Sequence, residues 1–243
     1  MLRFFTLIFI ISLTSLMAKT NFLPFQTSLL KVDGTYLYIK DSPSFTVGSS
    51  GIVLHAFDES HKTIVATVEV VAKKQGEAVL KFKKFKGLQQ SALPLYNITP
   101  KKGDTIILNY LYQRAMAVVP DSETLQYVTS KFNDIEWIHP DIFGSKLAVD
   151  YTPTPTKDDF TNECSQNSYA LLFFAVEGKG YFVDCNSFKI LARTDLPQTS
   201  QKTTPKVPFY SRLDGIKGRM FGLMGGDGIN NYDRYYKKML NVK

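Results

Sequence analysis

The sequence of 243 residues has little of the chemistry from which most active sites are built. It contains two cysteines, one tryptophan and three histidines, and His55, His61 and His139 are scattered along the chain. A C-x-x-C pair is absent, which argues against a thioredoxin-like redox centre. Scattered histidines do not support a metal site. The sequence therefore predicts no metal and no cofactor.

Motifs of nucleophilic and phosphate chemistry are also missing. Only two residues separate the glycines of Gly48–Gly51, so this stretch is a turn rather than a G-x-S-x-G nucleophile elbow. Gly225–Gly228 lacks the lysine and threonine of a P-loop. His139 and Asp141 remain as an acid–base candidate, but we favour Asp141 as a helix cap. We expect the chain not to be an enzyme.

Arginine is scarce relative to lysine. The chain has 23 lysines and 6 arginines, and its formal net charge is +7. Arginine is the residue of bidentate recognition of bases and phosphates, so this balance does not point to nucleic acid. We interpret the charge as a source of solubility and of attraction to acidic surfaces or proteins.

Long apolar runs are confined to the N-terminus. Met1–Arg3 is a short positive start, and Phe4–Leu16 is an uncharged run of 13 residues, whereas about 20 are needed to span a bilayer. This pattern predicts a secretory signal peptide over residues 1–18, with cleavage after Ala18. An uncleaved anchor is the alternative, because Leu16 is bulkier than the residue preferred three before the cut. We expect an exported protein without a transmembrane span in the mature chain, in the periplasm or at the outer membrane and cell surface.

The two cysteines, Cys164 and Cys185, leave several possibilities open. In an oxidising compartment an isolated pair is most simply a disulfide, which would stabilise the fold by about 3 kcal/mol in the chain-entropy model. Two free buried thiols are one alternative, and metal or redox chemistry is another.

Residues 24–104 have the period-two pattern of short β-strands. Asp33-Gly34 supplies the residues of a tight hairpin turn. Five strands at this spacing predict a small antiparallel barrel or curled sheet. The expected strands are Phe25–Val32, Thr35–Ile39, Ile52–Ala56, Thr63–Val71 and Ala78–Phe85.

Residues 105–196 alternate strands and helices, which predicts a small α/β domain. Asp121 can cap a helix through Phe132, and Thr156 with Asp159 predicts a capping box for a helix over Lys157–Gln166. The expected strands are Ile106–Leu111, Ala115–Val119, Ile135–Ile138, Ala170–Val176, Gly180–Asp184 and Phe188–Ala192.

Residues 197–206 are polar and predict an extended linker. Residues 207–243 follow as a C-terminal segment with expected helices over Tyr210–Met220 and Tyr232–Leu240. The predicted fold class is α+β, in which a small antiparallel barrel-like domain precedes a small α/β domain and a short helical tail.

A lysine-rich stretch covers one predicted strand. Its lysines alternate partly with apolar residues, so one side of the strand would be apolar and the other basic. We interpret it as a solvated strand whose lysines deter pairing between sheet edges. The alternative is a patch of ammonium groups for an acidic partner. The lysines are Lys81, Lys83, Lys84 and Lys86.

Five segments of the chain together resemble one known family, the N-terminal domain family of bacterial plasminogen-binding protein A, which are exported proteins of Gram-negative bacteria. The resemblance extends over nearly all of the chain after residue 18. It implies a surface or envelope protein that binds host plasminogen through a C-terminal lysine. The segments are Val47–Val71, Leu93–Pro120, Trp137–Phe143, Leu171–Phe188 and Val207–Leu213.

The sequence ends in Lys243, so the lysine that the resemblance implies falls on this residue. A terminal lysine presents an ammonium group and a free carboxylate, separated by a four-carbon stem. A kringle lysine site binds them with carboxylates at one end, cationic groups at the other and aromatic walls between. We expect plasminogen capture through Lys243. The alternative is a periplasmic structural or assembly factor of the envelope, with other envelope proteins as partners.

Overall fold

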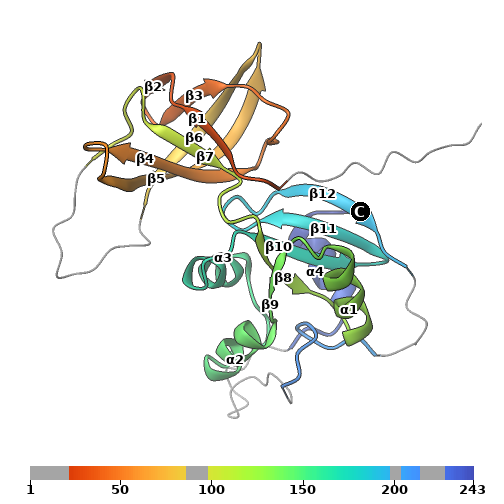
Figure 1. Cartoon of the computed structure of the whole chain (residues 1–243). Coiled ribbons are helices and arrows are strands. Elements are labelled where there is room, and N and C mark those ends of the chain that lie inside the picture. The colour runs from red at the N-terminus through yellow and green to blue at the C-terminus, as the bar shows by residue number, and fades with distance from the viewer. Residues whose placement is uncertain (1–21, 86–97, 198–203, 214–227) are drawn as a thin grey trace, which may run out of the picture.

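The computed structural model describes residues 22–85, 98–197, 204–213 and 228–243 (Figure 1). Several expected features lie outside the described residues. They are the signal peptide, Lys86, residues 198–203 of the linker and residues 214–220 of the expected helix Tyr210–Met220.

Seven antiparallel strands form the first sheet, in the order β1-β7-β4-β5-β6-β3-β2. β1 and β2 lie at opposite edges, although only Leu29 and Leu30 separate them along the chain. The Leu29 N–H donates to the Asp104 carbonyl and the Leu30 N–H to the Tyr38 carbonyl, so this short stretch bridges the two edges. The sheet therefore curls around its own apolar core, as expected. The strands are β1 (Phe25–Ser28), β2 (Lys31–Asp33), β3 (Tyr36–Lys40), β4 (Ser50–Ala56), β5 (Lys62–Lys74), β6 (Glu77–Lys84) and β7 (Thr105–Leu108).

β7 differs from the expectation. We expected the α/β domain to begin at residue 105, but Thr105–Leu108 pairs with β1 and β4 in the first sheet. The strand also ends before Leu111, because Asn109 and Leu111 have φ values of 54° and 62°, in the left-handed region that a strand does not accommodate. A short apolar run carries no information about which sheet it joins, and this is why its place was missed.

Five strands form the second sheet, in the order β12-β11-β10-β8-β9, with β8 parallel to both β9 and β10. All six residues of β10 are buried, as a strand covered on both faces requires. The strands are β8 (Arg114–Val118), β9 (Glu136–Ile138), β10 (Leu171–Val176), β11 (Lys179–Asp184) and β12 (Ile190–Asp195). One helix, α1 (Ser122–Lys131), covers one face of this sheet. The other face carries α2 (Asp141–Val149), α3 (Lys157–Gln166) and α4 (Tyr232–Leu240), and the fold is thus α+β (Figure 1).

The first turns of α1 and α3 have the predicted capping residues. The Asp121 carboxylate accepts the Thr124 N–H at 2.7 Å, and Thr156 with Asp159 forms both bonds of a capping box. α4 has the expected bounds, Tyr232–Leu240. α2 begins at Asp141, where we expected a helix cap, but no range for this helix was predicted from the sequence.

Cys164 and Cys185 form a disulfide. The bond ties α3 to the turn after β11, and the Thr161 hydroxyl donates to the Cys185 carbonyl at 2.8 Å beside it. Of the alternatives that the sequence left open, the disulfide is the one found in the structure.

A buried carboxylate joins the two sheets. Asp184, at the end of β11, is fully buried, and its Oδ2 accepts hydrogen bonds from Ser50 Oγ at 2.5 Å and Tyr112 Oη at 2.7 Å. Tyr112 Oη in turn accepts the Ser50 N–H at 2.8 Å. Asp184 Oδ1 accepts the Ser187 N–H at 2.5 Å. Because Ser50 belongs to β4, this network fixes the first sheet to the second.

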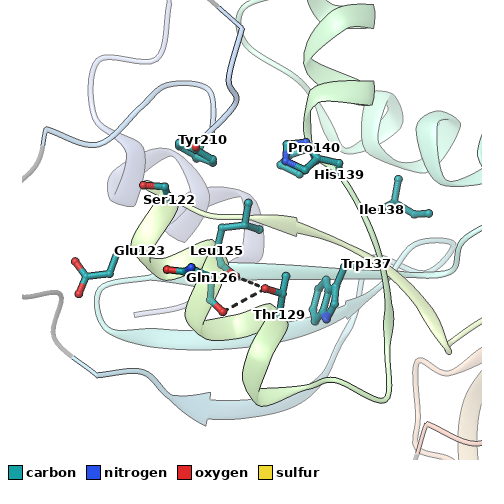
Figure 2. Close-up of a pocket in the computed structure, with 10 residues that line it drawn as sticks. All are labelled: Ser122, Glu123, Leu125, Gln126, Thr129, Trp137, Ile138, His139, Pro140 and Tyr210. Atoms are coloured by element: carbon teal, nitrogen blue, oxygen red, sulfur yellow. Dashed lines mark hydrogen bonds between the residues drawn. The ribbon is translucent and has the colours of Figure 1, made fainter.

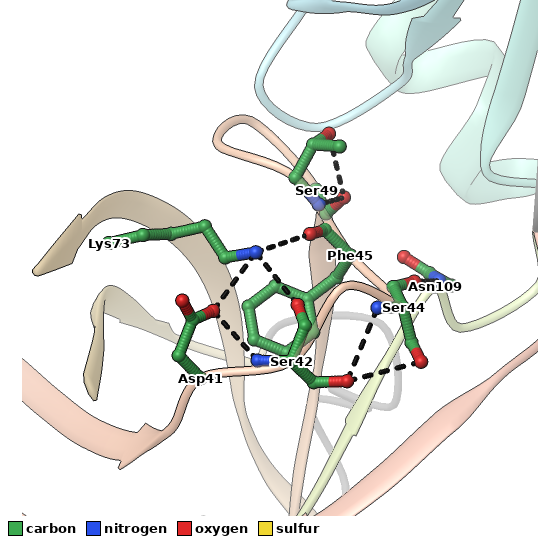
Figure 3. Close-up of polar contacts among 8 residues, drawn as sticks. Asp41, Ser42, Ser44, Phe45, Ser49, Lys73 and Asn109 are labelled. Atoms are coloured by element: carbon green, nitrogen blue, oxygen red, sulfur yellow. Dashed lines mark hydrogen bonds and ion pairs between the residues drawn. The ribbon is translucent and has the colours of Figure 1, made fainter. Parts of the chain in front are cut away.

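The loop before β4 is held by a lysine (Figure 3). Lys73 Nζ donates to the carbonyls of Ser42 at 2.7 Å and Phe45 at 2.8 Å, and pairs with Asp41 Oδ1 at 2.9 Å. The ammonium group also lies 4.5 Å from the centre of the Phe45 ring. The hydrogen bond from Lys73 lowers the pKa of Asp41. Lys73 thus acts inside the molecule, where it positions the loop that leads to Ser50.

Gly48 permits the close approach of the two sheets. Its φ is 95°, and a Cβ atom at this position would lie 2.6 Å from the Cβ of Lys189, in the turn before β12. The Ser187 hydroxyl donates to the Gly48 carbonyl at 2.6 Å. A side chain at residue 48 would therefore be strained and would push the sheets apart.

Replacing both cysteines by alanine should lower the free energy of unfolding by about 3 kcal/mol, because the bond closes a loop with a sequence separation of 21 residues in the unfolded chain. Urea denaturation of the oxidised protein measures the change. The wild-type protein with the bond reduced is the control and should lose a similar amount. A double variant as stable as the oxidised wild type would contradict this account.

The pH dependence of stability should report the buried carboxylate. Burial raises the pKa of Asp184, so the folded protein keeps a proton that the unfolded chain releases at lower pH. The contribution of this bound proton to the free energy of unfolding is fully present below the ordinary aspartate pKa of about 3.9. It is lost as the pH rises through the raised pKa of Asp184. Between these two pKa values, we expect Asp184 to lower the free energy of unfolding by up to about 1.4 kcal/mol for each unit that the pH rises.

Asp184→Asn should reduce this decrease of the free energy of unfolding with rising pH, because asparagine does not titrate. Denaturant titrations at a series of pH values measure the slope, and Asp134→Asn, at an exposed position before β9, is the matched control with the wild-type slope. The same slope in Asp184→Asn as in the wild type would disprove this role for Asp184.

Candidate functional site

The C-terminal helix is anchored along its whole length. Tyr232 and Tyr236 are buried, and their hydroxyls donate to the carbonyls of Val118 at 2.8 Å and Pro208 at 2.7 Å. Leu240 is buried in the same core. The last turn of α4 is therefore fixed to the body of the protein.

The chain reverses direction after α4. Asn241 has φ 54° and ψ 44°, the left-handed conformation that commonly ends a helix. Its N–H donates to the Lys238 carbonyl and the Val242 N–H to the Lys237 carbonyl, which is the pattern of a Schellman motif. Val242 packs against the core, and Lys243 is exposed. Lys243 thus projects directly from the folded body.

A cationic cavity adjoins Lys243. It has a volume of about 380 Å³ and lies between the β10–β11 hairpin and the end of α4, with Lys179, Arg193, Lys237 and Lys243 in its lining. The one carboxylate in the lining, that of Glu177, pairs with Lys237 at 2.7 Å. The surroundings of Lys243 are therefore predominantly positive.

The lysine stretch lies on β6, as expected, and Lys81, Lys83 and Lys84 are exposed. Lys81 is paired on both sides, with Tyr36 of β3 and Glu69 of β5, so it does not guard a sheet edge. Lys83 and Lys84 pair with β5 but lie beyond the register with β3, so for them the interpretation that they deter pairing between sheet edges stays a prediction. Lys81 lies opposite Glu69 of β5, where opposite charges favour pairing. Burial is the main cause that raises the pKa of Glu69, and the nearby lysines act in the other direction. Lys86 lies outside the described residues.

Asp141 does not cap α2, so that interpretation is also wrong. Pro140 occupies the cap position and makes no side-chain cap bond. The Asp141 carboxylate instead accepts hydrogen bonds from the Ser211 hydroxyl at 2.9 Å and from the Arg212 backbone N–H at 2.8 Å and Nε at 2.6 Å. These contacts hold residues 210–213 in a non-helical path, although we expected a helix to begin at Tyr210.

The His139–Asp141 pair is arranged for structure rather than acid–base work. Burial opposes the shift, but the hydrogen bonds from Arg212 and Ser211 lower the pKa of Asp141 to about 2. The carboxylate is then ionised near neutral pH and serves as the counter-ion of Arg212. His139 Nδ1 accepts the Asp141 N–H at 3.2 Å and lies 3.3 Å from Asp141 Oδ2.

A cleft opens beside His139, and Figure 2 shows the residues that line it. Its volume is about 660 Å³, and it separates the first turns of α1 from the end of β9 and the start of α2. Trp137, His139 and Tyr210 line it and are all partly buried. Sequence reasoning singled out His139 alone. Trp137 lies two residues before it and was interpreted only as part of a strand, and Tyr210 reaches the cleft from a distant segment.

Two general properties of the described residues bear on function. No group of three or more histidine, cysteine, aspartate or glutamate side chains is arranged to hold a metal ion within residues 22–85, 98–197, 204–213 and 228–243. In the same part of the chain, none of the helices combines the length and apolar character required to cross a bilayer.

Comparison with known proteins identifies the family. Residues 24–240 match the family described as plasminogen-binding protein pgbA N-terminal. Proteins named plasminogen-binding protein PgbA from Helicobacter pylori strains J99 and 26695 are 27% and 26% identical to this chain over 243 residues. These alignments cover 99% of the chain and 53% and 52% of the two relatives, so the chain spans about half the length of the curated relatives it matches. The chain therefore belongs to the plasminogen-binding protein pgbA N-terminal family.

Proposed function

We propose that this protein is an exported surface protein that binds plasminogen, with Lys243 as a ligand of the kringle lysine site. The observation that carries the proposal is the family match over residues 24–240, because the relatives are named for plasminogen binding. The name describes binding rather than catalysis, and the ionised, fully engaged Asp141 agrees with a non-enzymatic role.

The surroundings of Lys243 support this choice of ligand. Its side chain is exposed, and Lys179, Arg193 and Lys237 line the same cavity. A kringle lysine site presents carboxylates to the ammonium group, so a positive surface around the ligand would steer the two proteins together. Where the chain ends at Lys243, the free carboxylate would lie beside these cations.

The exposed lysines of β6, Lys81, Lys83 and Lys84, are a second proposed contact. They offer ammonium groups without an adjacent free carboxylate, so each is a poorer match to a lysine site than Lys243. Their contribution would be long-range attraction to acidic partners.

The short distance between Lys243 and the folded body sets the expected affinity. Only Asn241 and Val242 separate Lys243 from α4, and Val242 packs against the core. A kringle would have to approach the protein surface closely, and a single lysine is a small ligand. Useful binding would therefore come from several kringles or from many copies of the protein on one surface.

This anchored tail also favours a second candidate function, a periplasmic structural or assembly factor of the envelope. Protease treatment of intact cells distinguishes the two functions. A surface protein that binds plasminogen is degraded by the external protease, whereas a periplasmic factor survives until the outer membrane is opened.

Deleting Lys243 should reduce plasminogen binding at least tenfold, because both the ammonium group and its adjacent carboxylate are lost. One alanine added after Lys243 should also weaken binding, because it moves the carboxylate away. Surface plasmon resonance with the immobilised protein measures both changes, and 6-aminohexanoate should compete with the wild type.

Lys238→Ala is the matched control for charge, because Lys238 is an exposed lysine in the last turn of α4. It should bind plasminogen nearly as the wild type does. Undiminished binding after deletion of Lys243 would reject Lys243 as the ligand, and absence of binding by the wild type would reject the proposed function itself.

A further inference from the structure

A cavity lies between the two sheets, away from Lys243. Its volume is about 340 Å³, which is within the usual range of small-molecule sites. β4 and β5 of the first sheet line one side, and α3 with the turn after β11 lines the other, where the disulfide Cys164–Cys185 is part of the lining. Junctions between structural units are common positions for small-molecule sites.

The side formed by the first sheet is mainly apolar. Val53 of β4 belongs to the core of that sheet, so its neighbour Ile52 points the other way, into the cavity. Ile52 is only 4% exposed, although it belongs to none of the apolar cores found among the described residues. Thr67 of β5 lies opposite Ile52 in the strand register. Further apolar lining comes from Ile64, Phe85 and Leu111.

Polar groups without a protein partner lie on the other side. Ser165 of α3 and Ser168 after it are exposed, and Asn186 is partly buried. The side chains of these three residues form no hydrogen bond with another described residue. Their hydroxyl and amide groups can both donate and accept hydrogen bonds, so they remain available to a ligand at the opening of the cavity.

Two other hydroxyl groups of the lining are already engaged. Ser50 donates to Asp184 at 2.5 Å, and Thr161 donates to the Cys185 carbonyl at 2.8 Å. These contacts belong to the fold, and the polar contacts of a ligand would therefore come from the partner-free side chains.

The lining also carries no charge. Among the described residues that form it, none is an aspartate, glutamate, lysine, arginine or histidine. An ion that left water for this cavity would lose its hydration without gaining a counter-charge, which is costly. The cavity therefore favours an uncharged ligand.

We propose that this cavity binds an uncharged organic molecule that has an apolar body and a hydroxyl group. The body would contact Ile52, Ile64 and Phe85, and the hydroxyl group would bond to Ser168 or Asn186 near the opening. Such a ligand touches both sheets and would stabilise the junction between them. Lys243 is not part of this lining, so the proposal is independent of plasminogen binding.

The test is a titration of the full chain with phenethyl alcohol, followed by heteronuclear NMR. The amide signals of Ile52, Thr67, Ser165 and Asn186 should shift in a saturable way, because these residues line both sides of the cavity. Phenylacetate and phenethylammonium have the same size with opposite charges, and each should bind about tenfold more weakly or not at all. Equal binding of the three compounds, saturation at other residues, or no saturable shift would overturn the proposal.

Two variants connect binding to the cavity. Ser165→Trp places an indole ring at the opening and should weaken phenethyl alcohol binding about tenfold or more. Asn186→Ala removes one polar contact and should weaken binding about two- to tenfold. The matched controls are Asn162→Trp and Asn162→Ala, because Asn162 is exposed on the same helix and lies outside the lining.

Circular dichroism verifies the fold of each variant. Wild-type affinity in a folded Ser165→Trp variant would show that the alcohol binds elsewhere and would overturn the proposal. An equal loss of affinity in the Asn162 controls would have the same consequence, because the effect would then not depend on the cavity.

Discussion

The carboxylate of Asp184 is the interaction on which the arrangement of the two sheets depends. It accepts hydrogen bonds from Ser50 of the first sheet, from Tyr112 of the connection between the sheets, and from Ser187 of the turn after β11. Burying a carboxylate is costly, and the raised pKa of Asp184 reflects that cost. Without the carboxylate, the donors of Ser50 and Tyr112 would be buried without this acceptor, so the network stabilises one relative position of the sheets.

Other features of the molecule support this junction. Lys73 holds the loop before β4, Gly48 lets that loop approach the turn before β12, and the disulfide fixes the turn after β11 to α3. On the opposite side of the second sheet from α1, the tyrosines of α4 anchor the C-terminal segment and set the position of Lys243. The rigid body thus determines how each proposed contact is presented, and neither Lys243 nor the cavity between the sheets lies on a long independent arm.

Local patterns in the sequence predicted local structure well. Asp121 and the Thr156–Asp159 pair have partners within three residues, so the caps of α1 and α3 could be read directly. The contacts that define the sites join distant segments. Asp184 meets Ser50 across 134 residues, and Asp141 meets Arg212 across 71 residues, and neither pairing leaves a pattern in one sequence. The sheet to which β7 belongs was predicted wrongly for the same reason, since its short apolar run fits either sheet.

The most direct test of this account is differential scanning calorimetry of Asp184→Ala beside the wild type. If the buried carboxylate couples the sheets, the wild type should unfold in one cooperative transition, with equal calorimetric and van't Hoff enthalpies. The variant should resolve into two transitions, one for each sheet with its own core. A single transition in the variant, merely displaced to lower temperature, would show that the sheets are coupled by other contacts and would contradict the central role of Asp184.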